Sequence, residues 1–212
     1  NKLADEYLKA VFWEMFLKEK DKFEIKKLAE VCEKITDGTH KTPKYKEKGI
    51  PFLRVTDITE SNSTKKFISE KEHKELIKRC KPEKGDILYT KNGTIGIAKV
   101  IDWDYSFSIF VSLCLIKPKE EMINNKYLEY FLNTPFALRQ ATAHSKKATI
   151  INLHLIEIKK IKIPLPPLQL QKKFASIVKK VEKIKEKQKK SKKDVEELFN
   201  ALMQRAFKGE LV

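Results

Sequence analysis

The sequence has little of what marks several common classes of protein. Its three cysteines, Cys32, Cys80 and Cys114, are far apart and form no Cys-x-x-Cys pair, which argues against a disulfide framework and a zinc ribbon and favours a reducing cytoplasm. The longest apolar run, at residues 109–116, is too short to cross a bilayer, and no signal peptide precedes the first charged residues. We therefore expect a soluble cytoplasmic protein with no membrane partner.

Acidic residues are a minority among the charges. The 212 residues include 45 Lys and Arg against 29 Asp and Glu, which gives a formal net charge of +16. Such an excess favours a polyanionic partner, above all nucleic acid, although a lysine-rich solvated surface is an alternative. The length allows one compact core plus an appendage. Because the first residue is Asn1 and not a methionine, we also expect a fragment or a trimmed chain.

Patterns for catalysis are scarce. Gly93 and Gly96 are not followed by Gly-Lys-Ser/Thr, which argues against a nucleotide site. Residues 133–136, Asn-Thr-Pro-Phe, resemble the Asn-Pro-Pro-Phe/Tyr loop of amino-methyltransferases, but a helix interruption is the simpler interpretation. Residues 157–159 have the acidic-x-Lys spacing of magnesium-dependent nucleases, a triplet expected by chance here. The four histidines are too far apart to suggest a metal site. We expect no cofactor, no metal and no catalytic residue.

Local patterns predict an α+β fold, a globular mixed-sheet domain with a short N-terminal helix and a long C-terminal coiled-coil helix. Apolar residues at helical spacing predict an amphipathic helix over residues 3–20. Short β-branched and aromatic runs then alternate with turns. The predicted strands lie at residues 50–58, 86–90, 95–102, 106–117 and 159–164. The predicted helices lie at 70–78 and at 125–143, the latter interrupted near Pro135. Asn92 and Gly93 predict a tight hairpin turn.

The last part of the chain predicts a coiled coil. A helix of about forty residues can begin with Pro167 near its first turn and would reach about 60 Å, too long to pack wholly on a globule of this size. Its heptad seam consists of Leu170, Phe174, Ile177, Val181, Ile184, Gln188, Ser191, Val195, Leu198 and Leu202. The polar pair Gln188 and Ser191 is typical of positions that set register. We expect a partner helix, and a solitary charged helix is the alternative.

An internal similarity links the two ends of the chain. Residues 6–16 align without gaps to residues 197–207 and share a Glu, an Ala and the final Phe. The similarity indicates one period of a larger repeat, with the end of one helix appearing at both termini. Chance similarity between two amphipathic helices is the alternative.

Three polar, basic loops are candidate DNA-contacting segments. They lie at residues 36–46, 91–94 and 144–149 and combine cations, hydroxyls, an amide and an aromatic side chain. In the second loop, an Asn could pair with adenine and a Lys with guanine or phosphate. Solvated basic loops are the alternative. The candidate DNA-binding residues are Thr39, His40, Lys41, Thr42, Lys44, Tyr45, Lys46, Arg54, Lys91, Asn92, Thr94, Ser145, Lys146, Lys147 and Thr149.

Several short motifs together resemble the specificity subunits of type I restriction-modification systems. They are Leu-Ala-Glu-Val at 28–31, Asp-Gly-Thr-His at 37–40 with Thr-Pro at 42–43, Gly-Ile-Pro-Phe-Leu at 49–53 with Asp-Ile at 57–58, Gly-Asp-Ile-Leu at 85–88 with Gly-Thr-Ile-Gly at 93–96, Tyr-Leu-Glu-Tyr-Phe-Leu at 127–132, and Ile-Pro-Leu-Pro-Pro-Leu at 163–168 with Gln171. The combination covers nearly the whole chain, and it is specific although no single element is.

The resemblance implies a domain organisation. Residues 18–165 would form a DNA target recognition domain, residues 1–17 the end of a preceding helical spacer and residues 166–212 a second helical spacer. Members of the family usually contain two recognition domains joined by antiparallel helices, and each domain reads one half of a split site.

The resemblance also implies the partners. They would be double-stranded DNA, methyltransferase (modification) subunits, indirectly the restriction subunit, and a second recognition domain gained by homodimerisation or in a longer chain. Because separate subunits perform the chemistry in this family, the chain would be a non-catalytic specificity subunit. Two alternatives are a methyltransferase or nuclease component with its own catalytic residues, and a coiled-coil scaffold.

Overall fold

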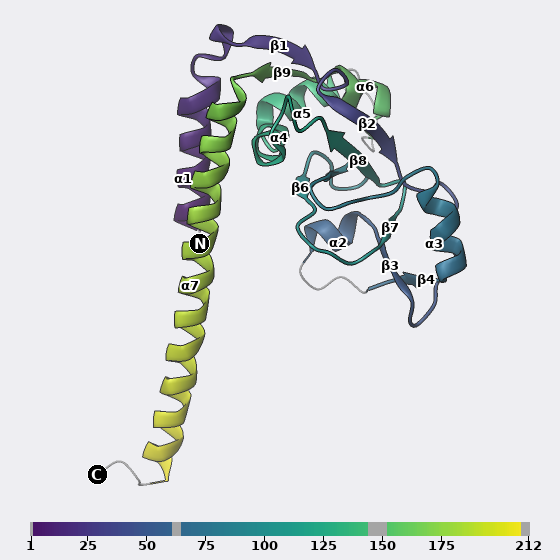
Figure 1. The fold of residues 1–212 in the computed structure, drawn as a ribbon. Helices are drawn as coiled ribbons and strands as arrows, with labels where there is room; N and C mark the ends of the chain where they lie inside the picture. The colour runs from purple at the N-terminus through teal and green to yellow at the C-terminus, as the bar shows by residue number, and fades with distance from the viewer. Residues whose placement is uncertain (1, 61–64, 144–151, 209–212) are drawn as a thin grey trace.

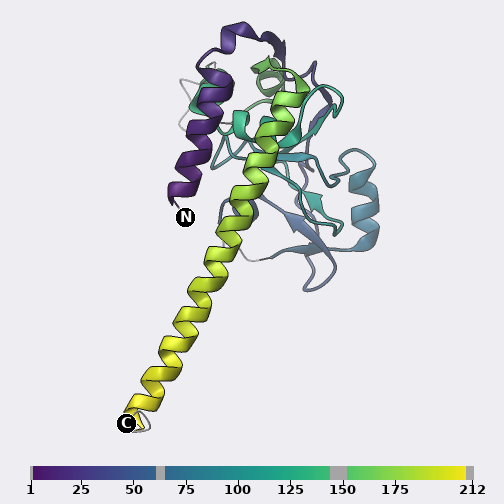
Figure 2. The ribbon, with the colours of Figure 1, turned by 60° about the vertical axis from the view of Figure 1, so that its left-hand side comes forward.

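The structure is a computed structural model that describes residues 2–60, 65–143 and 152–208. The fold is α+β, as predicted: a globule of small sheets and short helices, from which one long helix extends (Figures 1 and 2). Within the described residues, none of the helices combines the length and the apolar character that crossing a bilayer requires.

Three small sheets form the β part of the globule. The largest has the order β2-β8-β5-β6 and is antiparallel, with β2 at Cys32–Asp37, β5 at Ile87–Thr90, β6 at Ala98–Val100 and β8 at Leu113–Pro118. A second has the order β4-β3-β7, with β3 at Ile50–Leu53, β4 at Phe67–Ile68 and β7 at Ser108–Ile109. The third pairs β1 at Glu24–Lys27 with β9 at Lys162–Leu165, so the chain enters and leaves the globule side by side.

Helices cover the sheets and flank the globule. The N-terminal helix is α1 at Lys2–Phe12, continued by the π-helical turn η1 at Trp13–Leu17, and the C-terminal helix is α7 at Leu168–Phe207. The others are the 3-10 turn η2 at Lys20–Lys22, α2 at Val55–Thr59, α3 at Glu70–Ile77, α4 at Asn125–Leu132, α5 at Pro135–Thr142 and α6 at Leu155–Lys160. The predicted helix at 70–78 and the break near Pro135 are confirmed. The predicted forty-residue helix is also confirmed, with Pro167 at the N-cap just before the first turn.

Several predicted strands are shorter than expected. The strand expected at 50–58 ends at Leu53, because Asp57 accepts a hydrogen bond from the backbone N–H of Arg54 at 2.8 Å and so begins α2. The strand expected at 106–117 divides into β7 and β8, and the one expected at 159–164 begins only after α6.

The tight turn expected at Asn92 and Gly93 is instead a longer connection. It spans residues 91–97, and Gly93 and Gly96 adopt positive φ angles of 75° and 82°. Asn92 does not, so glycine alone supplies the left-handed conformation there.

Residues 133–134 interrupt the helical segment between α4 and α5, and Pro135 begins α5. The side-chain amide of Asn133 donates to the carbonyls of Ala98 and Glu129, and its oxygen accepts from the Ala98 N–H at 3.0 Å. The hydroxyl of Thr134 caps α5 by accepting from the Ala137 N–H at 3.2 Å. These contacts give the methyltransferase-like tetrapeptide at 133–136 a structural role, in joining α4 to β6 and in capping α5.

Aromatic side chains join the two terminal helices to the globule. Phe12 and Phe16, from the end of α1 and its π-helical turn, lie with their ring centroids 5.2 Å and 5.6 Å from that of Phe174 in α7. Tyr127 in α4 lies 4.8 Å from Phe16. All four rings are almost fully buried. The early part of α7 is therefore a core element, packed antiparallel to α1.

The predicted seam of α7 divides at this point. Leu170, Phe174, Ile177 and Val181 are buried or half-buried against the core. From Ile184 to Leu202 the seam positions are exposed. Pairing of the outer seam with another helix stays a prediction.

Gln171 fastens the start of α7 to the globule. The side chain is fully buried; its oxygen accepts from the Asn124 N–H at 2.8 Å, and its amide donates to the carbonyls of Pro166 at 2.8 Å and Met122 at 3.2 Å. These three bonds explain why a glutamine follows the Pro-Leu-Pro-Pro-Leu segment.

We expect Gln171→Leu to lower the free energy of unfolding by about 3 kcal/mol, because it leaves one buried acceptor and two half-buried groups, a donor and an acceptor, without their partner. Urea denaturation of the 212-residue chain measures the change. Gln169→Leu, an exposed position in the same turn, is the matched control and should change stability by less than about 0.5 kcal/mol. Equal stability of the two variants would contradict this role of Gln171.

Candidate nucleic-acid interface

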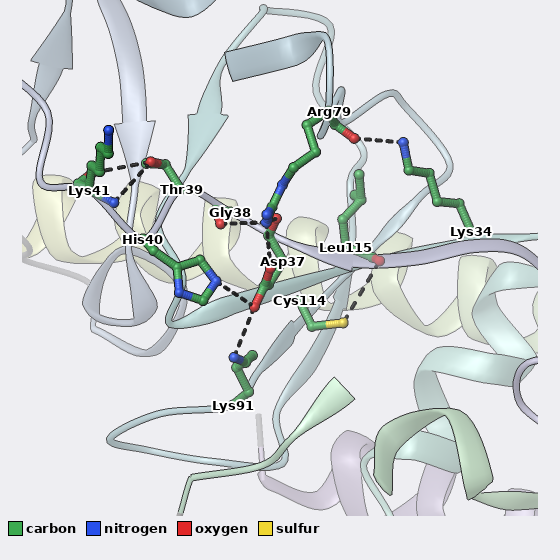
Figure 3. A network of polar contacts seen from close by, with 10 residues as sticks. All are labelled: Lys34, Asp37, Gly38, Thr39, His40, Lys41, Arg79, Lys91, Cys114 and Leu115. Carbon is green, nitrogen blue, oxygen red and sulfur yellow. Dashed lines mark hydrogen bonds and ion pairs between the residues drawn. The ribbon is translucent and has the colours of Figure 1, made fainter. Parts of the chain in front are cut away.

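A buried carboxylate at the end of β2 is surrounded by two cations and an imidazole (Figure 3). The Asp37 side chain is 6% exposed; its Oδ2 lies 3.1 Å from Lys91 Nζ and 3.2 Å from His40 Nε2, and its Oδ1 lies 2.5 Å from an Arg79 guanidinium nitrogen. We call these four residues the Asp37 cluster. It connects the end of β2, the loop that follows, the end of α3 and the end of β5.

The charges of the cluster determine the ionisation of Asp37. Burial alone would raise the pKa of Asp37, but the hydrogen bond and charge of Lys91, with the charges of His40 and Arg79, outweigh burial and lower the pKa below its ordinary value. The carboxylate therefore stays ionised at neutral pH. The Lys91 ammonium neutralises the charge of this carboxylate inside the protein, because the Lys91 side chain is also only 6% exposed.

Gly38 places the loop that follows Asp37. A Cβ atom at Gly38 would lie 2.1 Å from the backbone oxygen of Ile109, so no side chain fits there. The backbone then bonds to the segment between β7 and β8: the Thr39 N–H donates to the Ile109 carbonyl at 3.1 Å, and the Val111 N–H donates to the Thr39 carbonyl at 3.0 Å. In the Asp-Gly-Thr-His motif, Asp37 is thus a counter-ion, Gly38 permits close approach, and His40 is exposed.

The 91–97 connection is held beside this loop. The Lys91 N–H donates to the Ser112 carbonyl and the Leu153 N–H donates to the Lys91 carbonyl, both at 2.9 Å. Asn92 forms an isolated β-bridge with Asn152. Together the segments surround an open hollow of about 630 Å³. The residues that line it are Asp37, His40, Arg79, Lys91, Asn92, Val111, Asn152, His154 and Leu155.

The structure brings part of the predicted DNA-binding set together. His40, Lys41, Thr42, Lys44, Tyr45, Lys46 and Thr94 are exposed, and Thr39 and Asn92 are half-buried. Tyr45 packs on Phe52 of β3, with the Lys66 ammonium 5.4 Å from its ring centroid. Ser145, Lys146, Lys147 and Thr149 lie outside the described residues. Contact of these residues with DNA stays a prediction.

Two of the predicted residues have surroundings that differ from the expectation. Lys91 was expected to present its ammonium on a hairpin, but burial against Asp37 turns it inward and makes it part of the scaffold. The Arg54 side chain is 26% exposed and lies 3.2 Å from Asp57, where it helps to cap α2. Both side chains are engaged in holding backbone segments.

Sequence reasoning missed Asp37 and Arg79. Asp37 stood in a quoted motif, and its position at a strand end before glycine was a usable signal. Arg79 follows α3 in no recognisable motif, and only the fold brings it to Asp37. Within the described residues, no group of three or more His, Cys, Asp or Glu side chains could hold a metal ion.

The known proteins that this chain resembles belong to one family. The chain is similar to a putative type I restriction enzyme specificity subunit of Haemophilus influenzae, with 34% identity over 48% of this chain and 25% of the relative. It is similar to the EcoBI specificity subunit of Escherichia coli, with 28% identity over 77% of this chain and 36% of the relative. The chain therefore spans less than two fifths of the length of these curated relatives.

Solved structures share the fold. The HsdS subunit of Thermoanaerobacter tengcongensis superposes over 99% of this chain and 52% of its own, with a TM-score of 0.60 and 19% identity. The S subunit of a type I restriction-modification system of M. genitalium superposes over 96% of this chain and 53% of its own, with a TM-score of 0.53 and 19% identity. A family model described as the type I restriction modification DNA specificity domain matches residues 20–197. The chain with its Asp-Gly-Thr-His loop and its long helix thus belongs to the type I restriction modification DNA specificity domain family.

Proposed function

We propose that this chain is the sequence-reading part of a type I restriction-modification complex, that it reads one half of a split DNA site, and that it performs no chemistry itself. The observation that carries the proposal is the convergence of the loops at 36–46 and 91–97 on one side of the globule, joined by the Asp37 cluster. Exposed lysines in the first loop would supply phosphate contacts and the rims of the hollow would contact base edges. The formal charge of +16 is consistent with this partner.

The two terminal helices support a spacer role. Lys185 Nζ lies 2.7 Å from Asp5 Oδ1, and Phe174 contacts Phe12 and Phe16, so α1 and α7 run side by side in opposite directions. We propose that residues 1–17 and 166–212 are the spacer elements around a recognition domain at 18–165. The outer part of α7 would bind the spacer helix of a second recognition domain, in a longer chain or in a second copy.

Methyltransferase subunits would dock along the spacer helices and so link the chain indirectly to the restriction subunit. The outer part of α7 leaves large apolar side chains exposed. They are Ile184, Val195, Leu198, Phe199, Leu202, Met203 and Phe207. Exposed apolar side chains gathered along one helix are typical of an interaction surface.

Selection from a randomised duplex pool tests the proposal. We expect the chain mixed with methyltransferase subunits to enrich one half-site sequence, with an affinity that falls steeply as salt increases. The triple variant Lys41→Ala, Lys44→Ala, Lys46→Ala should bind all duplexes more weakly and reduce the salt slope by about 3, while the enriched sequence stays the same.

A matched triple variant in and next to the β1–β9 sheet, Lys22→Ala, Lys27→Ala, Lys162→Ala, removes the same charge from exposed positions outside both the loops and the spacer helices and should keep the slope. The proposal would be overturned if the wild-type chain enriched no sequence. Methyl transfer or cleavage by the chain alone would favour the catalytic alternative.

A further inference from the structure

The Arg79 guanidinium of the Asp37 cluster is anchored through one nitrogen and is partly exposed to solvent. A single Arg79 nitrogen, Nη2, donates to the backbone oxygen of Asp37 at 2.6 Å, to its Oδ1 at 2.5 Å and to the backbone oxygen of Gly38 at 2.9 Å. The Nε and Nη1 groups make no hydrogen bond within residues 2–60, 65–143 and 152–208. The side chain is 56% exposed. One nitrogen of the guanidinium is thus anchored on Asp37 and Gly38 (Figure 3), while more than half of the side chain is exposed.

The backbone of Arg79 is fixed as well. The Lys34 ammonium donates to the Arg79 carbonyl at 2.6 Å, and the Arg79 N–H donates to the Leu76 carbonyl at 3.3 Å at the end of α3. An arginine restrained at both ends loses little side-chain entropy when it binds, which makes it a pre-organised donor.

The charge of Arg79 is not cancelled by its anchor. Lys91 is buried against the same carboxylate, so the Asp37–Lys91 pair is already neutral. Arg79 and His40 both line two adjoining hollows, the one of about 630 Å³ described above and a second of about 400 Å³. The guanidinium therefore carries its positive charge into a concave surface, next to the predicted reading loop.

We propose that Arg79 is a DNA contact and that Asp37 is its positioning residue. The inference rests on the proposed function. The Nε–H and Nη1–H groups, which do not share an edge of the guanidinium, would each donate to a single acceptor, a chemistry that DNA offers as O6 or N7 of guanine or as a phosphate oxygen. Buried Lys91 then supports the site and does not read it.

Duplex selection with variants of Arg79 distinguishes the two sources. If Arg79 reads guanine, Arg79→Met reduces discrimination at one base pair by about tenfold and leaves binding to the other duplexes nearly unchanged. If Arg79 binds a phosphate, Arg79→Lys keeps binding and Arg79→Met weakens binding to every duplex and lowers the salt slope by about 1. Lys78→Met is the control, because Lys78 is the exposed preceding residue and pairs with Glu75.

The contact is overturned if Arg79→Met matches Lys78→Met in affinity, preference and salt slope. If the wild-type chain enriches a sequence and Arg79→Met does not differ from Lys78→Met in preference, affinity or salt slope, this inference alone fails. If the wild-type chain enriches nothing, the proposed function fails.

The positioning role of Asp37 needs a variant that leaves no buried charge unpaired. The double variant Asp37→Asn, Lys91→Met removes both members of the buried pair and should stay folded. We expect it to lose the same discrimination, or the same phosphate contact, as Arg79→Met, and we expect adding Arg79→Met to it to have no further effect. Wild-type preference in the folded double variant would overturn the role of Asp37.

Discussion

Replacement of Asp37 by asparagine is expected to lower the free energy of unfolding by about 3–5 kcal/mol, because the Lys91 ammonium would be left buried without a counter-charge. The same change removes the anion that faces Arg79 and His40. Urea denaturation followed by circular dichroism measures the loss. It also shows whether the slope of the transition is preserved, as it should be if the folded state is otherwise unchanged.

Lys91→Met is the companion variant. It keeps Asp37 ionised next to Arg79 and His40, so we expect a smaller loss than for Asp37→Asn. The double variant should be more stable than Asp37→Asn alone, since a neutral pair replaces an unpaired buried cation. An Asp37→Asn chain as stable as the wild type would show that the cluster does not support the fold.

Acidification tests the same carboxylate. Because the pKa of Asp37 is lowered in the folded chain from its ordinary value of 3.8, the unfolded chain binds more protons. The stabilisation is fully present above pH 3.8 and is lost as the pH falls through the lower folded value. Subtracting the curve of the double variant Asp37→Asn, Lys91→Met, which leaves no buried lysine unpaired, from that of the wild type isolates this contribution, and the difference should shrink in that acid range.

Phe174→Ala is expected to cost about 3–5 kcal/mol, because it empties the centre of the aromatic group that joins α7 to α1 and α4. The Phe174 side chain is 0% exposed, and its ring centroid lies 4.9 Å from that of Tyr130 and 5.2 Å from that of Phe12. Equilibrium unfolding in urea measures the loss.

The same substitution farther along α7 provides the control. Phe199 is 61% exposed, so Phe199→Ala should change the stability of the single chain by less than about 0.5 kcal/mol. Similar losses for the two variants would mean that the outer helix is already packed in the single chain, contrary to the structure.

The sequence predicted best what depends on local periodicity. The forty-residue helix, the helix at 70–78 and the break near Pro135 follow from apolar spacing and from proline, which act within a few residues. The strand expected at 50–58 was too long because Asp57, a capping side chain, competes with β-branched neighbours for the backbone. Such competition depends on one hydrogen bond and is not visible in composition.

The candidate site was predictable only in part. The exposed loop at 40–46 was found from its charge and turn residues. The inward orientation of Lys91 was missed because its partner Asp37 lies 54 positions earlier in the chain, and only the pairing of β2, β8 and β5 brings them together. Arg79 was missed for the same reason, since its place beside Asp37 depends on how α3 packs.

The close backbone contact at Gly38 limits which positions of the loop at 36–46 tolerate substitution. The base of the loop is fixed by a site where no side chain fits. Beyond it, Lys41, Thr42 and Lys44 are exposed, whereas His40 pairs with Asp37, Pro43 is buried and Tyr45 packs on Phe52. Substitutions at 41, 42 and 44 can therefore accumulate without disturbing the attachment, and under the proposed function these are the loop positions at which contacts with DNA could change.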